Sequence, residues 1–320
     1  MLGLRLQQTE QQRRNDRAWR LKNLQQRKMA MKVAYYPGCS LHGTAEEYDE
    51  STRMVCNGLG IELEELEDWN CCGASSAHAT NDKLAVALAA RNLALAEQAR
   101  HQTLLIPCSA CYQRLKSADA RIRNDQKLGV EMASLTGMPY SGKLEILQII
   151  QILARPEMLE KVREKIRKPL KDLATVCYYG CLTVRPPKYT QVADYENPMF
   201  MDELMQAAGA ANRFWSYKTE CCSAGLAMAR SDVTKKLAGI LLRMADEADA
   251  ECIVVSCPMC HANLDTRQDA LLAERQIPRK IPILYVTELL ALAMGIQAVG
   301  KLWPKHLVDP RPLLTAKGLA

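Results

Sequence analysis

Short apolar runs alternate along the chain with longer stretches in which apolar residues recur at helical spacing. The long stretches predict helices over 82–100 and 233–248, and residues 281–299 predict a strand that runs into an amphipathic helix. Strands alternating with helices favour an α/β fold of small parallel sheets with crossover helices. The runs that predict buried strands cover 33–36, 104–107, 175–179 and 253–256.

The cysteines show that this pattern occurs twice. Each half of the chain contains one lone cysteine, one adjacent pair and one C-x-x-C motif, and a predicted strand ends just before each lone cysteine and each C-x-x-C. We therefore expect two pseudo-symmetric domains over 31–168 and 169–320, the second with a C-terminal tail, joined near 161–171 and preceded by an extension over 1–30. Ten of the thirteen cysteines belong to the scheme: Cys39, Cys71, Cys72, Cys108 and Cys111, then Cys181, Cys221, Cys222, Cys257 and Cys260.

The net charge of +6 is concentrated at the N-terminus. Residues 1–30 carry eight basic and two acidic groups, 8 − 2 = +6, so the rest of the chain is formally neutral and shows no signature of a nucleic-acid-binding domain. The extension could be a basic amphipathic helix that contacts a partner or a membrane surface. A solvated tail, or residues added by a start codon upstream of Met31, is favoured, because no helical face is convincingly apolar.

The same sequence predicts a cytoplasmic protein. It contains no apolar stretch of membrane-spanning length, and no apolar segment follows the N-terminal charges as in a secretory signal. In a reducing compartment, thirteen cysteines are better explained as metal ligands or redox groups than as disulfides.

The predicted topology brings the cysteines of each half together. In open α/β sheets, binding sites form at the carboxyl ends of the strands, where following helices direct their N-terminal amides. Structural zinc sites and cubane iron–sulfur clusters use four protein ligands, whereas each half here offers five, two of them adjacent. This count, with ligation by thiolates alone, favours a multi-iron assembly over zinc, which stays as the less favoured alternative.

These motifs, with Cys-Pro-Met-Cys-His at 257–261 and the tail sequence at 305–310, resemble the duplicated CCG-domain proteins, and most closely the B subunit of heterodisulfide reductase. The resemblance covers residues 31 to about 312. It implies that the two sets of five cysteines named above hold two noncubane [4Fe-4S] clusters. The second motif departs from the family pattern, because Ser223 follows Cys222 where the family has Gly. We expect the loop to move its glycine to Gly225, and we keep the second cluster because all five thiolates remain.

The resemblance also implies a reaction and partners. In the family, a disulfide between the clusters is cleaved as each cluster binds one sulfur and supplies one electron. The expected partners resemble two other subunits of heterodisulfide reductase: an iron–sulfur protein with two cubane clusters, like the C subunit, and a flavin-containing protein, like the A subunit. The sequence agrees with a separate flavin protein, since Gly58-Leu59-Gly60 makes no nucleotide-binding fingerprint here.

Relatives in sulfur-oxidising bacteria suggest a lipoate-binding protein as a further partner and a role in sulfur oxidation. Reduction and oxidation are not distinguished by the sequence. Two other functions stay open. One is an iron–sulfur subunit serving a succinate dehydrogenase or fumarate reductase type of complex, associated with a membrane only through its partners. The other is a pure electron-relay or anchoring subunit that touches no substrate.

Three further residues are candidates for catalysis. His42 and His261 follow cluster cysteines and could deliver protons to a departing thiolate, although a capping or backbone-bonded histidine is the commoner case. Arg185 could attract an anionic substrate or neutralise cluster charge. Cys177 could be a spare ligand or a resolving thiol but is better explained as a buried strand residue. The two remaining cysteines, Cys56 and Cys252, have no counterpart in the repeat and are assigned to the core.

Overall fold

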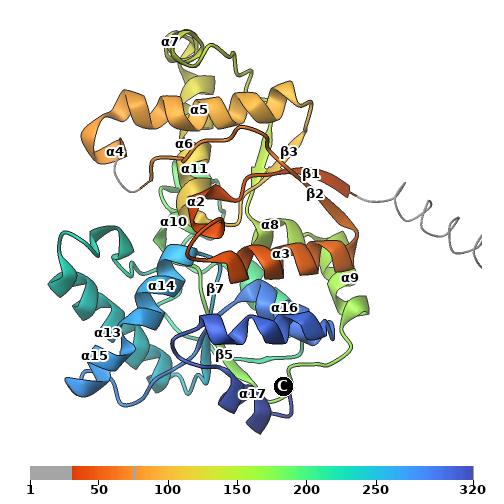
Figure 1. The fold of residues 1–320 in the computed structure, drawn as a ribbon, viewed down its shortest axis with the longest axis vertical. Helices are drawn as coiled ribbons and strands as arrows, with labels where there is room; N and C mark the ends of the chain where they lie inside the picture. Colours follow the sequence, from red (N-terminus) through yellow and green to blue (C-terminus); the bar gives the residue numbers. More distant parts are fainter. Residues whose placement is uncertain (1–30, 75–76, 320) are drawn as a thin grey trace, which may run out of the picture.

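The computed structural model describes residues 31–74 and 77–319, which form two similar halves, each built on a four-stranded sheet (Figure 1). The predicted extension over 1–30 lies outside the described residues. The first half contains β1 (Met31–Tyr35), α2 (Gly38–Leu41), α3 (Glu46–Leu59), β2 (Ile61–Glu65), α4 (Ala77–Thr80), α5 (Asp82–Gln98), β3 (Thr103–Leu105), α6 (Ser109–Asn124), α7 (Gln126–Thr136), β4 (Glu145–Leu147), α8 (Ile149–Leu153) and α9 (Pro156–Lys165).

The second half repeats the order of strands. It contains β5 (Ala174–Tyr178), α10 (Cys181–Val184), α11 (Pro187–Thr190), α12 (Phe200–Ala207), β6 (Ala211–Asn212), η1 (Ala224–Leu226), α13 (Ser231–Glu247), β7 (Cys252–Val255), α14 (Pro258–Thr266), α15 (Gln268–Ala273), β8 (Ile283–Tyr285), α16 (Val286–Ala293), η2 (Gln297–Lys301), η3 (Trp303–Lys305) and α17 (Arg311–Ala316).

Both sheets are parallel and have the same strand order. The order is β2-β1-β3-β4 in the first half and β6-β5-β7-β8 in the second, which confirms the predicted α/β fold. The two central strands of each sheet are the ones that precede the lone cysteine and the C-x-x-C motif, paired for example through Ala34 with Leu104 and Thr175 with Cys252. The reversal of strand order between these neighbours creates the switch point at which α/β sheets bind ligands.

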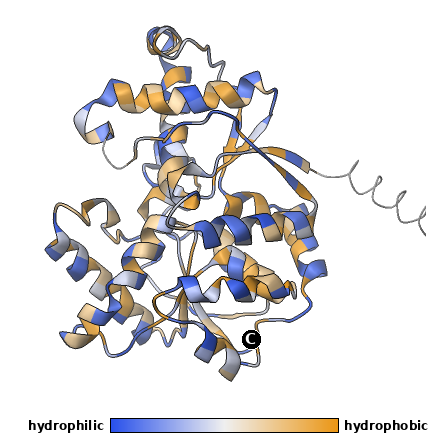
Figure 2. Cartoon of the chain, in the orientation of Figure 1, coloured by the Kyte–Doolittle hydropathy of each residue, from blue (hydrophilic) through white to orange (hydrophobic). Residues whose placement is uncertain are grey.

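The local sequence explains these elements. All residues of β5 and β7 are buried, as expected for central parallel strands covered on both faces. The helix α5 begins where the side chain of Asn81 accepts a hydrogen bond from the amide of Leu84 at 3.0 Å, and α13 carries the matching stretch of the second half. The side of α3 drawn in Figure 2 is largely hydrophilic, and the buried residues of this helix include Tyr48, Val55 and Leu59.

The structure differs from the expected pattern at two places. The helix α16 is buried at every one of its residues rather than amphipathic, because it packs against α3 of the first half as well as α12 of the second. The connection predicted over 161–171 is helical as far as Lys165, where α9 ends. Beyond α9, the amides of Arg167 and Lys168 donate to the carbonyl of Ala293 at 2.8 and 2.9 Å, which ties the connection to the second half.

The two halves meet through helices that adjoin the cysteine motifs. The helix α6 packs against α10 and α11, and α2 packs against α14. Two pairs of hydroxyl groups bridge the boundary: Ser109 with Thr183 at 2.9 Å and Ser51 with Thr287 at 2.7 Å. The boundary is thus built partly from the helices that position the cysteines and partly from α3 and α16.

Candidate metal centre

The cysteine motifs lie at the carboxyl ends of the central strands. Cys108 and Cys257 follow β3 and β7 and are the N-cap residues of α6 and α14. Cys39 and Cys181 follow β1 and β5 and lie in the first turns of α2 and α10. Because β1 adjoins β3 and β5 adjoins β7, the loops of each half lie side by side.

In the first half all five cysteines converge. The sulfur atoms of Cys39 and Cys71 are 3.9 Å apart, and those of Cys72 and Cys111 are 3.2 Å apart. The thiol of Cys111 is also within hydrogen-bonding contact of Cys108. We call this set the first quintet. Its sulfur atoms form a connected group contributed by three loops, as the repeat predicted.

The second half forms a matching group, which we call the second quintet. The sulfur atoms of Cys181 and Cys221 are 3.7 Å apart, those of Cys222 and Cys260 are 3.5 Å apart, and Cys260 contacts Cys257. Interaction with Cys108 of the first quintet is the largest cause that lowers the pKa of Cys257 well below its usual range. The two quintets therefore meet at the boundary between the halves.

Glycines make room for these sulfur atoms. Gly38 and Gly180, each just before a lone cysteine, have positive φ angles of 73° and 68°. A Cβ atom at Gly38 would lie 2.8 Å from the sulfur of Cys111, and one at Gly180 would lie 3.1 Å from the sulfur of Cys260. Side chains are excluded at both positions by conformation and by space.

The loops after the adjacent pairs show how the second motif adapts to serine. The amide of Gly73 donates to the sulfur of Cys71 at 3.5 Å, and the amide of Ser223 donates to Cys221 at 3.2 Å. Ser223 itself adopts a positive φ of 57°, so the expectation that Gly225 takes over this conformation is wrong. The second loop thus keeps the positive φ that Gly73 has in the first loop, and with it the contact between the amide of Ser223 and the sulfur of Cys221. The Ser223 hydroxyl is buried and has no hydrogen-bond partner among the described residues.

Burial divides each quintet into an open and a closed side. Cys39, Cys71 and Cys221 are exposed and Cys181 is partly exposed, while the other six cysteines are buried. Contact with Cys111 is the largest cause that lowers the pKa of Cys72 to about 4, and contact with Cys181 is the largest that lowers the pKa of Cys221 to about 6. Thiolate is the form that binds metals, and all thirteen cysteines are free. The donor sets thus fit soft-metal clusters.

Two tyrosines that the sequence analysis did not single out orient these loops. The hydroxyl of Tyr36 donates to the carbonyl of Asn70 at 2.8 Å, and that of Tyr178 donates to the carbonyl of Glu220 at 2.7 Å. Both carbonyls belong to the residue just before an adjacent cysteine pair. The signal was present in the sequence, because each tyrosine stands three residues before a lone cysteine.

The candidates His42 and Arg185 lie on the open sides. The Nε2 atom of His42 is 2.9 Å from a carboxylate oxygen of Glu65, and its ring meets Trp69 edge-on. The Nη1 atom of Arg185 donates to the carbonyl of Thr219 at 2.8 Å, and its charge helps to lower the pKa of nearby Cys221. Proton delivery by His42 and anion attraction by Arg185 stay predictions.

The third candidate, His261, belongs to a buried network. Its Nε2 atom lies 3.1 Å from both the carbonyl oxygen of Ile283 and Nδ1 of His306, and Nε2 of His306 lies 2.8 Å from Glu288. Burial lowers the pKa of His261 to about 3, so its ring is neutral near pH 7. Ligand atoms of His261, His306 and Asp265 lie within 4.8 Å of one another, but Asp265 already accepts the amides of residues 307 and 308. The network fastens the tail, and a proton-delivery role for His261 stays a prediction.

The three cysteines outside the quintets are core residues. Cys56, Cys177 and Cys252 are fully buried, and burial raises the pKa of Cys56 and of Cys252 to about 12. The sulfur of Cys177 lies 3.5 Å from the side-chain oxygen of Asn212. All three are buried thiols within the two halves, as expected, and burial is the largest cause that raises their pKa values.

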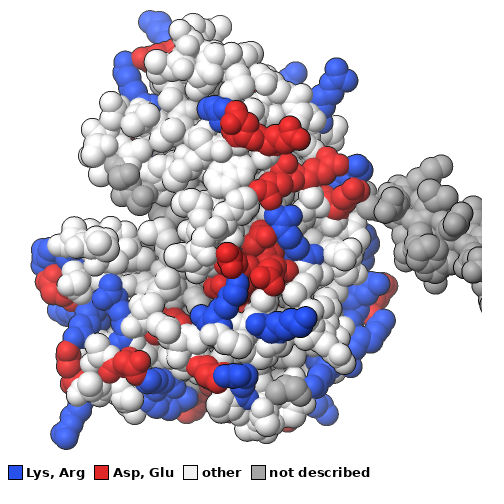
Figure 3. Space-filling model, in the orientation of Figure 1, with Lys and Arg blue, Asp and Glu red and all other residues white. Residues whose placement is uncertain are grey.

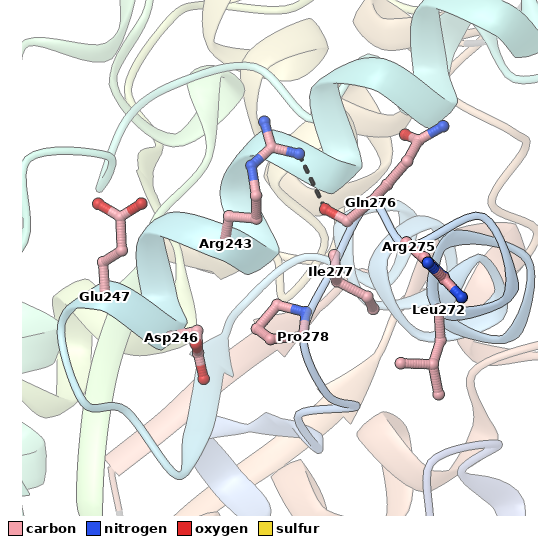
Figure 4. A pocket seen from close by; sticks show the side chains of 8 residues that line it. All are labelled: Arg243, Asp246, Glu247, Leu272, Arg275, Gln276, Ile277 and Pro278. Atoms are coloured by element: carbon pink, nitrogen blue, oxygen red, sulfur yellow. Dashed lines mark hydrogen bonds between the residues drawn. The ribbon is translucent and has the colours of Figure 1, made fainter.

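Other surface features lie away from the cysteines. A pocket of about 530 Å³ between α13 and the loop after α15 is lined by residues such as Arg243 and Gln276, which are hydrogen bonded at 2.9 Å (Figure 4), and by no cysteine. On the face drawn in Figure 3, acidic side chains gather near the middle, over α3, with basic side chains beside them. Within 31–74 and 77–319, no helix is long and apolar enough to cross a membrane.

Comparison with known proteins assigns the family. The CCG cysteine-rich domain matches residues 33–116 and 175–265, one copy in each half. The chain is 32% identical to the B subunit of the ferredoxin:CoB-CoM heterodisulfide reductase of Methanosarcina mazei over 271 residues, 82% of this chain and 89% of the relative. It is 31% identical to the 8-methylmenaquinol:fumarate reductase membrane anchor subunit of Wolinella succinogenes over 271 residues, 84% of this chain and 94% of the relative.

A solved structure adds evidence on the fold alone. A hypothetical protein from Helicobacter pylori superposes with a TM-score of 0.65 at 13% identity, over 86% of this chain and 51% of that one. Each domain match covers three of the four strands of one sheet and ends within the helix that begins at a C-x-x-C motif. With its duplicated motif, its duplicated sheet and these relatives, the chain belongs to the CCG cysteine-rich domain family, among the proteins that resemble the B subunit of heterodisulfide reductase.

Proposed function

We propose that this protein is the iron–sulfur catalytic subunit of a heterodisulfide reductase-like complex. In this proposal the two quintets hold two noncubane [4Fe-4S] clusters, and the complex cleaves or forms a disulfide or persulfide bond in cytoplasmic sulfur oxidation. The observation that carries the proposal is the pair of matching quintets, whose C-x-x-C loops adjoin at the hydroxyl of Tyr48. Five thiols per site, two of them adjacent, exceed what a single zinc ion uses.

The duplication suits a two-electron reaction. When bound, each cluster supplies one electron to one sulfur of the substrate bond. On the closed sides, the six buried cysteines would be shielded from bulk water. On the open sides, the exposed residues Cys39, Cys71 and Cys221 would leave the sites accessible to a substrate. Arg185 lies beside the open side of the second quintet, where its charge would favour an anionic sulfur group.

Partner proteins complete the proposal. Gly58-Leu59-Gly60 lies at the end of α3, where Gly60 is its C-cap, and not in a phosphate-binding loop after a strand. We therefore assign electron supply to two partners, an iron–sulfur protein with two cubane clusters and a flavin-containing protein, like the C and A subunits of heterodisulfide reductase. A lipoate-binding protein would deliver the substrate. Any attachment to a membrane would be made through such partners.

The fumarate reductase relative supports a second candidate. Its name describes a membrane anchor subunit, and its identity to this chain is nearly equal to that of the heterodisulfide reductase relative. In this alternative the same clusters relay electrons within a succinate dehydrogenase or fumarate reductase type of complex and bind no substrate.

Metal analysis and magnetic resonance of the anaerobically purified protein test both candidates. The proposal expects about eight iron atoms and matching sulfide per chain, and an electron paramagnetic resonance (EPR) signal that changes when a thiol is added. A signal indifferent to thiols would support the relay, and zinc without iron would overturn both. Cys257→Ala should lower the iron content, whereas Cys252→Ala, equally buried at the start of the strand that precedes Cys257, should leave it unchanged.

A further inference from the structure

Tyrosine hydroxyls hold the backbone at the start of four cysteine motifs. Tyr36 and Tyr178 each bind the carbonyl that precedes the adjacent pair of their own half. The two remaining carbonyls, those of Pro107 and Ser256, directly precede the C-x-x-C motifs, and both lie within hydrogen-bonding distance of one hydroxyl, that of Tyr48, at 3.3 and 3.0 Å. Tyr48 is thus shared between the halves, whereas the other two are local.

The surroundings of Tyr48 fix it in place. Its side chain is fully buried, and its ring stacks on Tyr285 of the second half with centroids 4.2 Å apart and an angle of 4° between the planes. Tyr285 in turn stacks on His261, the neighbour of Cys260, at 4.4 Å. A ring held on its face by a second ring has little freedom to withdraw its hydroxyl from the two carbonyls.

The repeat shows that Tyr48 has no equivalent. Tyr36 and Tyr178 stand three residues before their lone cysteines and are related by the duplication. Tyr48 stands nine residues after Cys39, and the residue nine after Cys181 is Thr190, which has no phenol. A single residue therefore serves both C-x-x-C loops at the boundary between the halves.

We propose that Tyr48 is a positioning residue for both clusters: its hydroxyl, shared by the carbonyls of Pro107 and Ser256, fixes the first cysteine of each C-x-x-C motif and so sets the separation of Cys108 and Cys257, across which the two clusters interact. The cluster part of this inference rests on the proposed function. The bond to a shared donor makes the two loops move together, because displacement of either carbonyl changes the geometry offered to the other.

The iron-loaded full-length chain gives the first test. Tyr48→Phe keeps the stacked ring and removes only the hydroxyl. It should retain iron and change the EPR signals of both clusters, together with the splitting that arises from their interaction. The matched controls Tyr36→Phe and Tyr178→Phe should each change one cluster only. Tyr48→Phe signals identical to those of the unmodified protein, or a change confined to one cluster, would overturn the proposal.

The metal-free full-length chain gives a second test that needs no cluster. Diamide takes two electrons and two protons from a pair of thiols as their sulfur atoms bond, and mass spectrometry of peptides identifies the disulfide between Cys108 and Cys257. Tyr48→Phe should slow its formation about fivefold, the equivalent of one hydrogen bond, and Tyr36→Phe should not. An unchanged rate in Tyr48→Phe overturns the proposal. If Tyr48→Phe slows the cross-link but the unmodified protein binds no iron, the positioning role of Tyr48 stands and only the proposed cluster function is refuted.

Discussion

Replacing Gly38 by Ala would place a methyl group against a thiol that we assign to the first cluster. A non-glycine residue at the positive φ of 73° costs roughly 1–2 kcal/mol. The new Cβ atom would also lie 2.8 Å from the sulfur of Cys111, too close for van der Waals contact, and overpacking of this kind costs about 1–3 kcal/mol. The variant should therefore lose about 2–5 kcal/mol of unfolding free energy.

Gly60→Ala supplies the matched control. Gly60 has nearly the same φ, 75°, but nothing lies within 4 Å of the position its Cβ would take, so it should lose only roughly 1–2 kcal/mol. Urea unfolding of the metal-free proteins measures both values. After anaerobic reconstitution, Gly38→Ala should bind about half of the iron bound by the unmodified chain, and Gly60→Ala all of it. Equal losses of stability and full iron in both variants would refute the inference that Gly38 makes room for the cysteine sulfur atoms that hold the first cluster.

Three further predictions follow from buried groups. Ser223→Gly relieves a positive φ and removes an unpartnered hydroxyl, so urea unfolding of the metal-free protein should show a gain of about 1 kcal/mol; a loss would mean that the hydroxyl has a partner. Burial opposes the charge of His306, but the carboxylate of Glu288 outweighs burial and raises the pKa of His306 above 6.5. The stability contributed by protonated His306 is therefore complete below pH 6.5 and is lost as pH rises through the raised pKa. His306→Gln should therefore cost about 3 kcal/mol near pH 6 and less near pH 9 in urea unfolding, and a cost independent of pH would contradict this. Cys56→Ala should cost about 1 kcal/mol in stability and leave the iron content unchanged, and a loss of iron would place Cys56 in the site.

The strands and the cysteine sets could be predicted because they depend on local pattern. The runs that end before Cys39 and Cys108 are short and apolar, which suffices for buried parallel strands, and the repeat of their spacing identified the quintets. The strands β2 and β4 were missed, because they carry charged residues at exposed positions, as edge strands do.

Features that depend on tertiary contacts, whether between the halves or within one half, could not be read from the sequence. The helix α16 was expected to have a polar face, and its complete burial follows from packing on both α3 and α12. The buried Glu288 is tolerated there because His306, distant in sequence, lies 2.8 Å away. The shape of the loop at Ser223 was equally hidden, since the amide contact to Cys221, and not the residue type, decides its φ.

The sequence by itself determined the duplicated α/β architecture and the ten cysteines of the two sites, because strand burial and ligand chemistry act through residue type and spacing. Only the tertiary structure decided that the loops preceding Cys108 and Cys257 adjoin and share the hydroxyl of Tyr48. The relative placement of two halves depends on side chains that pack across their boundary, and no periodic pattern along the chain encodes such contacts.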